Sequence, residues 1–168
     1  EERERERERE RERQRGQQKR PELIEKKDRK KKQRKENILK VIKLGEELPY
    51  NIDKVWKIIS DVTRCDWVPS VDSIVLEESI RRFTMEGIGE VHEKILINDP
   101  QNHKLQYSAI KTPTPLDHHL ATIDLQRAGD NCVFNWTSEI APEAFGEAIE
   151  NGMRISFDGL KQVLAQLD

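Results

Sequence analysis

The sequence has few of the features that mark export, disulfide bonding or membrane insertion. Cys65 and Cys132 are its only cysteines, and they stand far apart and outside any CxxC motif, which favours a reducing compartment. No apolar run approaches the ~18–20 residues of a membrane span, and no signal-peptide pattern opens the chain. We therefore expect an intracellular, cytoplasmic protein without a transmembrane segment. An organelle stays open because the chain begins without methionine.

Apolar residues are almost missing from the first part of the chain. Residues 1–36 contain 17 Lys and Arg against 11 Asp and Glu, with Leu23 and Ile24 as the only sizeable apolar residues, whereas residues 37–168 contain 13 against 21. So little apolar surface cannot offset the entropy of ordering a chain. We expect residues 1–36 to be a charged low-complexity tail, disordered or partly helical, and residues 37–168 to be one globular domain.

The end of the tail, residues 19–36, is strongly basic. Such a run is typical of a patch for nucleic acid or an acidic membrane. It has no aromatic residue to stack on bases, and charge blocks of this kind are commonly solvated extensions. The composition favours the solvated extension and leaves the binding patch as the alternative.

From residue 38 the apolar periodicity predicts an α+β domain. Asn51 can cap a helix with Ile52, Val55, Trp56 and Ile59 on one face, and a second short helix or irregular turn is expected over Asp61–Pro69. Pro142 and Glu143 open a long helix that runs to about Leu167. Seven strands are predicted, at Ile38–Leu44, Val71–Glu78, Ile80–Met85, Glu90–Asn98, Lys104–Lys111, His118–Gln126 and Asn131–Ile140. The order fits a curved antiparallel sheet of about seven strands around a long C-terminal helix, with two short helices after the first strand.

Several short motifs occur in an order that points to a known superfamily. They are Trp56-Lys57-Ile58-Ile59-Ser60-Asp61, Trp67-Val68-Pro69, Arg81-Arg82-Phe83-Thr84, Glu93-Lys94-Ile95, Leu105-Gln106-Tyr107, Pro113-Thr114-Pro115-Leu116-Asp117-His118-His119-Leu120-Ala121-Thr122 and Phe134-Asn135-Trp136. Through these motifs the chain resembles the START-like, or SRPBCC, proteins, which include polyketide cyclase/dehydratase-type domains and the Bet v 1-like helix-grip proteins. The resemblance implies a cavity between the sheet and the last helix.

Strand alternation predicts two charges among the inward-facing apolar residues. Arg81 shares a face with Phe83 and Met85, and Glu93 lies on the same face as Val91. A slip of one residue would put Arg82 in place of Arg81. The resemblance implies chemical roles, because in the lachrymatory-factor synthase an arginine and a glutamate at matching motif positions serve the chemistry. A structural ion pair is the alternative.

Apolar walls with a few polar anchors are the usual pattern of a small-molecule site. The residues expected to line it are Trp67, Met85, Glu93, Tyr107, His119, Ala121, Trp136, Ile149 and Met153. His119 is a possible proton donor or acceptor, although the sequence favours a hydrogen-bonded core histidine. His118 and His119 point to opposite faces of a strand, so we predict no metal site. No glycine-rich phosphate loop occurs, and no cofactor is predicted.

Three functions are consistent with these residues. The first is the binding or carriage of a small hydrophobic molecule such as a lipid. The second is a cofactor-independent enzyme of the cyclase, dehydratase or isomerase type, with Glu93 as general base or acid and Arg81 stabilising negative charge. The third is a protein-interaction module that uses the basic tail. The sequence favours the first, and it leaves the ligand and the oligomeric state open.

Overall fold

The computed structural model describes residues 2–10, 25–26 and 38–167. The chain divides into two compact units, Glu1–Asn37 and Ile38–Asp168. In the first unit residues 2–10 are helical, as are residues 25–26. The rest of the predicted tail, with most of its basic run, lies outside the described residues. None of the described helices is long and apolar enough to cross a membrane.

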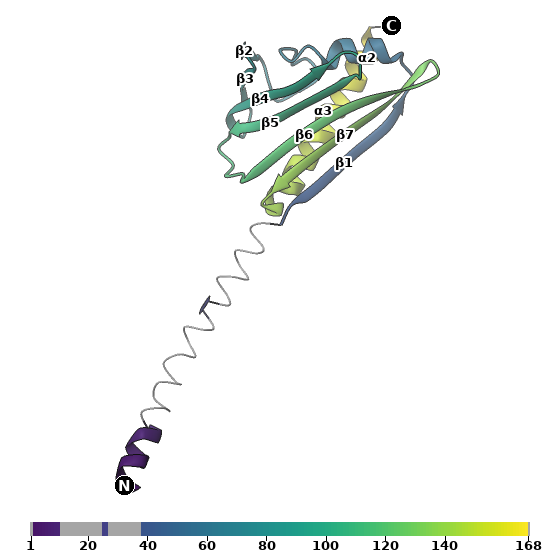
Figure 1. Ribbon diagram of the computed structural model, residues 1–168. Helices are drawn as coiled ribbons and strands as arrows, with labels where there is room; N and C mark the ends of the chain where they lie inside the picture. Colours follow the sequence, from purple (N-terminus) through teal and green to yellow (C-terminus); the bar gives the residue numbers. More distant parts are fainter. Residues whose placement is uncertain (1, 11–24, 27–37, 168) are drawn as a thin grey trace. The chain divides into compact units, whose positions relative to one another are not determined.

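The second unit is built on one antiparallel sheet of seven strands in the order β1-β7-β6-β5-β4-β3-β2. The strands are β1 (Lys40–Leu48), β2 (Val75–Glu77), β3 (Ile80–Met85), β4 (Gly89–Asp99), β5 (Lys104–Lys111), β6 (His118–Ala128) and β7 (Asn131–Ala141). Figure 1 shows this sheet curved, with the long helix α3 (Gly146–Gln166) running along one face. The predicted helix-grip fold is confirmed.

One helix, not two, follows the first strand. Helix α2 (Ile52–Ile59) begins as predicted, with the Asn51 side chain accepting the backbone N–H of Asp53 at 2.9 Å. The second short helix predicted over Asp61–Pro69 is absent from this described segment, which forms single turns. The Asp61 carboxylate accepts the backbone N–H and the hydroxyl of Thr63, and this local bonding competes with helix formation.

Several predicted ends also shift. β1 runs on to Leu48 because its pairing with β7 continues as far as Cys132, although Glu46 and Glu47 interrupt the apolar pattern. β2 is shorter than predicted, and Val71 makes an isolated bridge instead. The C-terminal helix opens with a short 3-10 helix, η1 (Glu143–Phe145), before α3.

The core lies between the inner face of the sheet and the two helices. Phe134 of β7 stacks on Phe157 of α3, with ring centroids 4.8 Å apart. Gly159 of α3 lies directly against the backbone carbonyl of Trp67, so closely that a Cβ atom there would clash. The absence of a side chain on Gly159 thus brings the Trp67 turn onto the helix.

Candidate functional site

A buried ion pair joins β3 and β4. The register of these strands sets Arg81 opposite Glu93, and Arg81 Nε donates to Glu93 Oε2 at 2.7 Å. Each side chain is 11% exposed. Arg82, by contrast, faces outward and pairs with Glu77 at the surface. Arg81 is therefore the arginine that meets Glu93 inside the sheet.

Tyr107 of β5 lies beside this pair. The Arg81 guanidinium carbon is 4.6 Å from the centroid of the Tyr107 ring, a cation–π distance. Burial raises the pKa of Tyr107 well above its ordinary value, and Glu93 adds to the shift while Arg81 and Trp136 oppose it. Burial, the largest single effect, opposes the charge of Arg81, but Glu93 and Tyr107 together outweigh it and the pKa of Arg81 is raised. Tyr107 is therefore a neutral phenol and Arg81 a cation at neutral pH.

The strands around Glu93 are bent. The pairing of β4 with β5 shifts register between His92 and Glu93 and again between Ile95 and Ile97. Such bulges increase local twist and redirect side chains. The first shift sets Glu93 opposite Ala109, a residue with only a methyl group.

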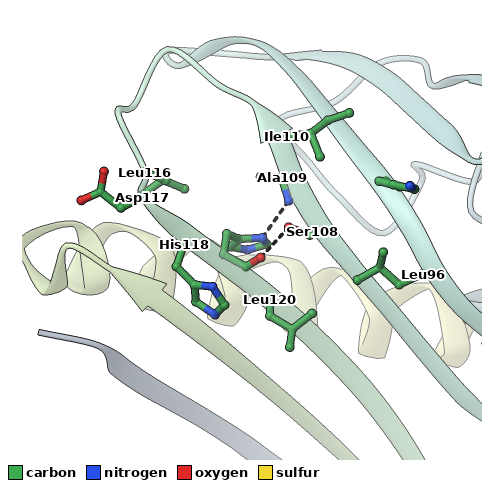
Figure 2. Close-up of a pocket in the computed structure, with 10 residues that line it drawn as sticks. Leu96, Ser108, Ala109, Ile110, Leu116, Asp117, His118 and Leu120 are labelled. Atoms are coloured by element: carbon green, nitrogen blue, oxygen red, sulfur yellow. Dashed lines mark hydrogen bonds between the residues drawn. The ribbon is translucent and has the colours of Figure 1, made fainter. Parts of the chain in front are cut away.

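His119 holds β6 to β5 where their backbone ladder ends. That ladder stops at the pair Tyr107 and Ala121. Beyond it, the backbone N–H of Ala109 donates to His119 Nδ1 at 2.9 Å, and Ser108 Oγ donates to the His119 carbonyl at 2.5 Å. Figure 2 draws both bonds as dashed lines. The imidazole thus replaces a missing strand hydrogen bond.

The charge state of His119 follows from its surroundings. Burial lowers its pKa, Glu93 opposes the shift, and His118 and Arg81 add to it. At neutral pH the ring is therefore neutral. Its ring centroid lies 6.1 Å from that of Tyr107, which places it in the same group of polar side chains.

A pocket of about 320 Å³ opens where β5 and β6 separate. Its walls are Lys94, Leu96, Ser108, Ala109, Ile110, Leu116, Asp117, His118, His119 and Leu120. Figure 2 shows the labelled residues of this pocket. Lys94, Leu96, Ile110 and His118 are exposed members of this lining. Since adjacent strand residues face opposite sides and Glu93 faces inward, the pocket opens on the outer face of the sheet.

The predicted apolar walls mostly meet in the core. Ile149 is half-buried against the core cluster, whereas Met85 is half-buried at the end of β3 and is not among the residues of that cluster. Five of the residues predicted to line the cavity belong to the hydrophobic core: Trp67, Tyr107, Ala121, Trp136 and Met153. Trp67 and Trp136 meet edge to face, with ring centroids 6.0 Å apart.

Three buried polar atoms in this region have no hydrogen-bond partner within the described chain: Trp67 Nε1, Trp136 Nε1 and Ser138 Oγ. The Trp136 side chain lies near enough to the Tyr107 hydroxyl to lower its pKa through hydrogen bonding, although the contact falls short of good hydrogen-bond geometry. Ser138 is 1% exposed and lies opposite Ala121. The sequence analysis did not predict Ser138 as a site residue. Its position two residues after Trp136 and four after Phe134 on β7 indicates that it faces inward with them.

The other histidines and the cysteines lie apart from the group formed by Arg81, Glu93, Tyr107 and His119. His118 faces outward, with Nε2 3.0 Å from a Glu139 carboxylate oxygen. Burial raises the pKa of the Cys132 thiol to about 11. Cys65 Sγ is 3.3 Å from the Asp72 carbonyl. Among the described residues no group of three or more His, Cys, Asp or Glu is placed to hold a metal ion.

Residues 46–167 match the model of a family described as polyketide cyclase / dehydrase and lipid transport. The fold is similar to that of the protein XoxI from Bacillus cereus, with a TM-score of 0.69 and 18% identity over 76% of this chain and 96% of that one. It is also similar to a Thermobifida fusca protein, with a TM-score of 0.65 and 18% identity over 76% and 95% of the two chains.

A plant enzyme has the same fold. Norcoclaurine synthase from Thalictrum flavum, in complex with dopamine and hydroxybenzaldehyde, matches with a TM-score of 0.63 and 18% identity, covering 78% of this chain and 89% of that one. No curated protein sequence matches the chain. The likeness to these structures shows a shared fold.

Proposed function

Because the chain belongs to the polyketide cyclase/dehydrase and lipid transport family, we propose that it binds one small hydrophobic molecule between its sheet and helix α3. The observation that carries the proposal is the Arg81–Glu93 pair with Tyr107, set into an otherwise apolar core. Burying two charges costs several kcal/mol, which their mutual attraction only partly offsets. A domain that needed only a sealed core would be as stable with apolar residues there.

The unpartnered polar atoms of Trp67, Trp136 and Ser138 support the same proposal. A buried donor without an acceptor costs about 1–3 kcal/mol. Ser138 lies opposite Ala121, Trp136 is two residues away on the same strand, and Trp67 packs on Trp136. A ligand with oxygen atoms would give these groups partners. The apolar residues around them would supply most of the affinity, at about 25 cal/mol per Å² removed from water.

A second candidate is an enzyme of the cyclase, dehydratase or isomerase type, and the Arg81–Glu93 hydrogen bond specifically favours it. Glu93 Oε2 is held by Arg81, and within the described chain the other carboxylate oxygen has no hydrogen bond, so it is free to take up a proton from a ligand. Arg81 and the Tyr107 phenol would stabilise the negative charge that develops on the ligand.

Native mass spectrometry of the protein purified from its own host tests the binding function. We expect a mass larger than that of the polypeptide by one small molecule per chain, which organic solvent releases. A second arm uses the stripped protein and an apolar fluorescent probe, and we expect one site per chain. A bare polypeptide mass together with no probe binding would reject the proposal.

A further inference from the structure

The polar residues of the site form one row across the sheet. Arg81 is paired with Glu93, and Glu93 with Ala109. The Ala109 N–H then bonds to His119, which is paired with Ile140 of β7. Glu93 and His119 therefore stand on either side of Ala109, whose methyl group leaves room between a carboxylate and an imidazole.

The hydrogen bond from Ala109 fixes which ring nitrogen of His119 carries the proton. Nδ1 accepts a backbone N–H, so in the neutral ring the proton is on Nε2. Nε2 lies across the ring from the bond to β5, and in the described part of the chain the hydrogen bond made by this ring is the one at Nδ1. His119 is thus a single, oriented N–H donor.

The charges around this donor cancel. Arg81 and Glu93 neutralise each other, and Tyr107 is a neutral phenol. At the rim of the 320 Å³ pocket that reaches His119, Lys94 and Asp117 also carry opposite charges. An anionic ligand would therefore meet no net positive charge, and burying a carboxylate that is not compensated is very costly.

Donors also outnumber acceptors. Besides His119 Nε2, the indole N–H groups of Trp67 and Trp136 and the hydroxyl of Ser138 are without partners. An oxygen that accepts hydrogen bonds would give these groups a partner, and the balanced charges around them favour an uncharged one.

On the basis of the proposed function, we infer that the ligand is a neutral carbonyl compound and that His119 donates its Nε2 proton to the carbonyl oxygen. The site therefore selects ketones, aldehydes or esters with an apolar body over fatty acids and other carboxylates. In the enzymatic alternative this hydrogen bond polarises the same carbonyl while Glu93, across Ala109, faces the adjacent carbon.

The test uses three probes of nearly equal size, 2-acetylnaphthalene, 2-ethylnaphthalene and 2-naphthoate, titrated calorimetrically into the full chain at pH 7.5. We expect the ketone to bind about tenfold more tightly than the hydrocarbon, as one added hydrogen bond implies. The carboxylate should bind at least tenfold more weakly than the ketone. The infrared carbonyl stretch of the bound ketone should fall below its value in an apolar solvent.

The variant His119→Asn separates the two roles of the ring, because its amide oxygen can still accept the Ala109 N–H while the Nε2 donor is gone. Ketone affinity should drop to that of the hydrocarbon, hydrocarbon affinity should stay, and the carbonyl stretch should return to its apolar-solvent value. His103→Asn, in the turn between β4 and β5 where the ring contacts Asp53 away from the pocket, should alter none of these.

The outcomes distinguish the two proposals. Equal binding of ketone and hydrocarbon by the unaltered protein, or an unchanged preference in His119→Asn, would overturn the inference and leave the proposed function standing. Tighter binding of the carboxylate would also overturn it. If none of the three probes binds, the proposed function fails and the inference fails with it.

Discussion

The Arg81 guanidinium lies 4.6 Å from the centre of the Tyr107 ring while its Nε bonds to Glu93. One cation thus connects two neighbouring strands, β3 and β4, to a ring on β5. The contact with the ring stabilises the buried guanidinium by about 1–2 kcal/mol. The ion pair and the phenol therefore form one unit, and removing any part of it changes the others.

Glu93→Gln should destabilise the domain by about 3 kcal/mol, because Arg81 then remains buried without a counter-charge. Urea unfolding at pH 7.5 measures the effect. If the protein is an enzyme, turnover should also fall by on the order of 10²-fold, since an amide cannot take up a proton.

The control for this variant is Glu90→Gln, on the same strand. Glu90 contacts His92 and Lys111 at the surface, and exposed pairs contribute little to stability. Its unfolding midpoint should stay close to that of the unaltered protein. Equal effects of the two substitutions would show that Glu93 is not a buried charge.

Ala109→Leu should block the proposed site. The added carbon atoms would fill the space between Glu93 and His119 and raise the Kd for 2-ethylnaphthalene at least tenfold, with a stability cost of about 1–3 kcal/mol from overpacking. Calorimetric titration measures the affinity, and circular dichroism checks the fold.

The same substitution elsewhere on the sheet, Ala128→Leu at the end of β6, provides the matched control and should leave the affinity unchanged. Unaltered probe binding by a folded Ala109→Leu protein would place the ligand away from this row.

The domain boundary predicts the effect of truncation. Residues 1–36 offer only Leu23 and Ile24 as sizeable apolar groups, so their removal should change the Tm by no more than about 4 °C, which corresponds to roughly 1 kcal/mol in a domain of this size. Differential scanning calorimetry of the full chain and of a chain starting at Asn37 makes the comparison. Loss of cooperative unfolding in the shorter chain would show that the tail is part of the folded unit.

The alternation of side chains made the charged pair predictable. Every second side chain of a strand points to the same face. Arg81 and Glu93 alternate with outward residues in step with apolar neighbours, so both could be predicted to face inward. The ends of β1 and β2 depend on pairing with distant strands, which a local pattern does not contain. The turns after Asp61 were ambiguous because side-chain bonding to Thr63 competes with a helix there.

The role of the His119 ring was not predictable in the same way. Its bond to Ala109 exists because β5 and β6 separate after Tyr107 and Ala121. That separation is a property of the sheet as a whole. Ser138 was missed for a different reason. Its position on the inner face of β7 follows from alternation, but the sequence does not indicate that its hydroxyl lacks a hydrogen-bond partner.

The pH dependence of stability should report on His119. Burial lowers the pKa of this residue in the folded protein, whereas in the unfolded chain it titrates near 6.5. Below about pH 6.5 the unfolded chain therefore takes up a proton that the folded protein does not. The stability that the neutral ring contributes is present above that pH and is lost as the pH falls, by at most about 1.4 kcal/mol per pH unit.

Urea unfolding at pH 7.5 and at pH 5.5 measures this loss, in a range above the titration of surface carboxylates such as Asp66 and Asp99, whose pKa values are lowered by their hydrogen bonds. His119→Asn removes the titrating group while keeping an acceptor for the Ala109 N–H, so the decline between the two pH values should become shallower. An unchanged decline in His119→Asn would mean that His119 is not held neutral inside the fold.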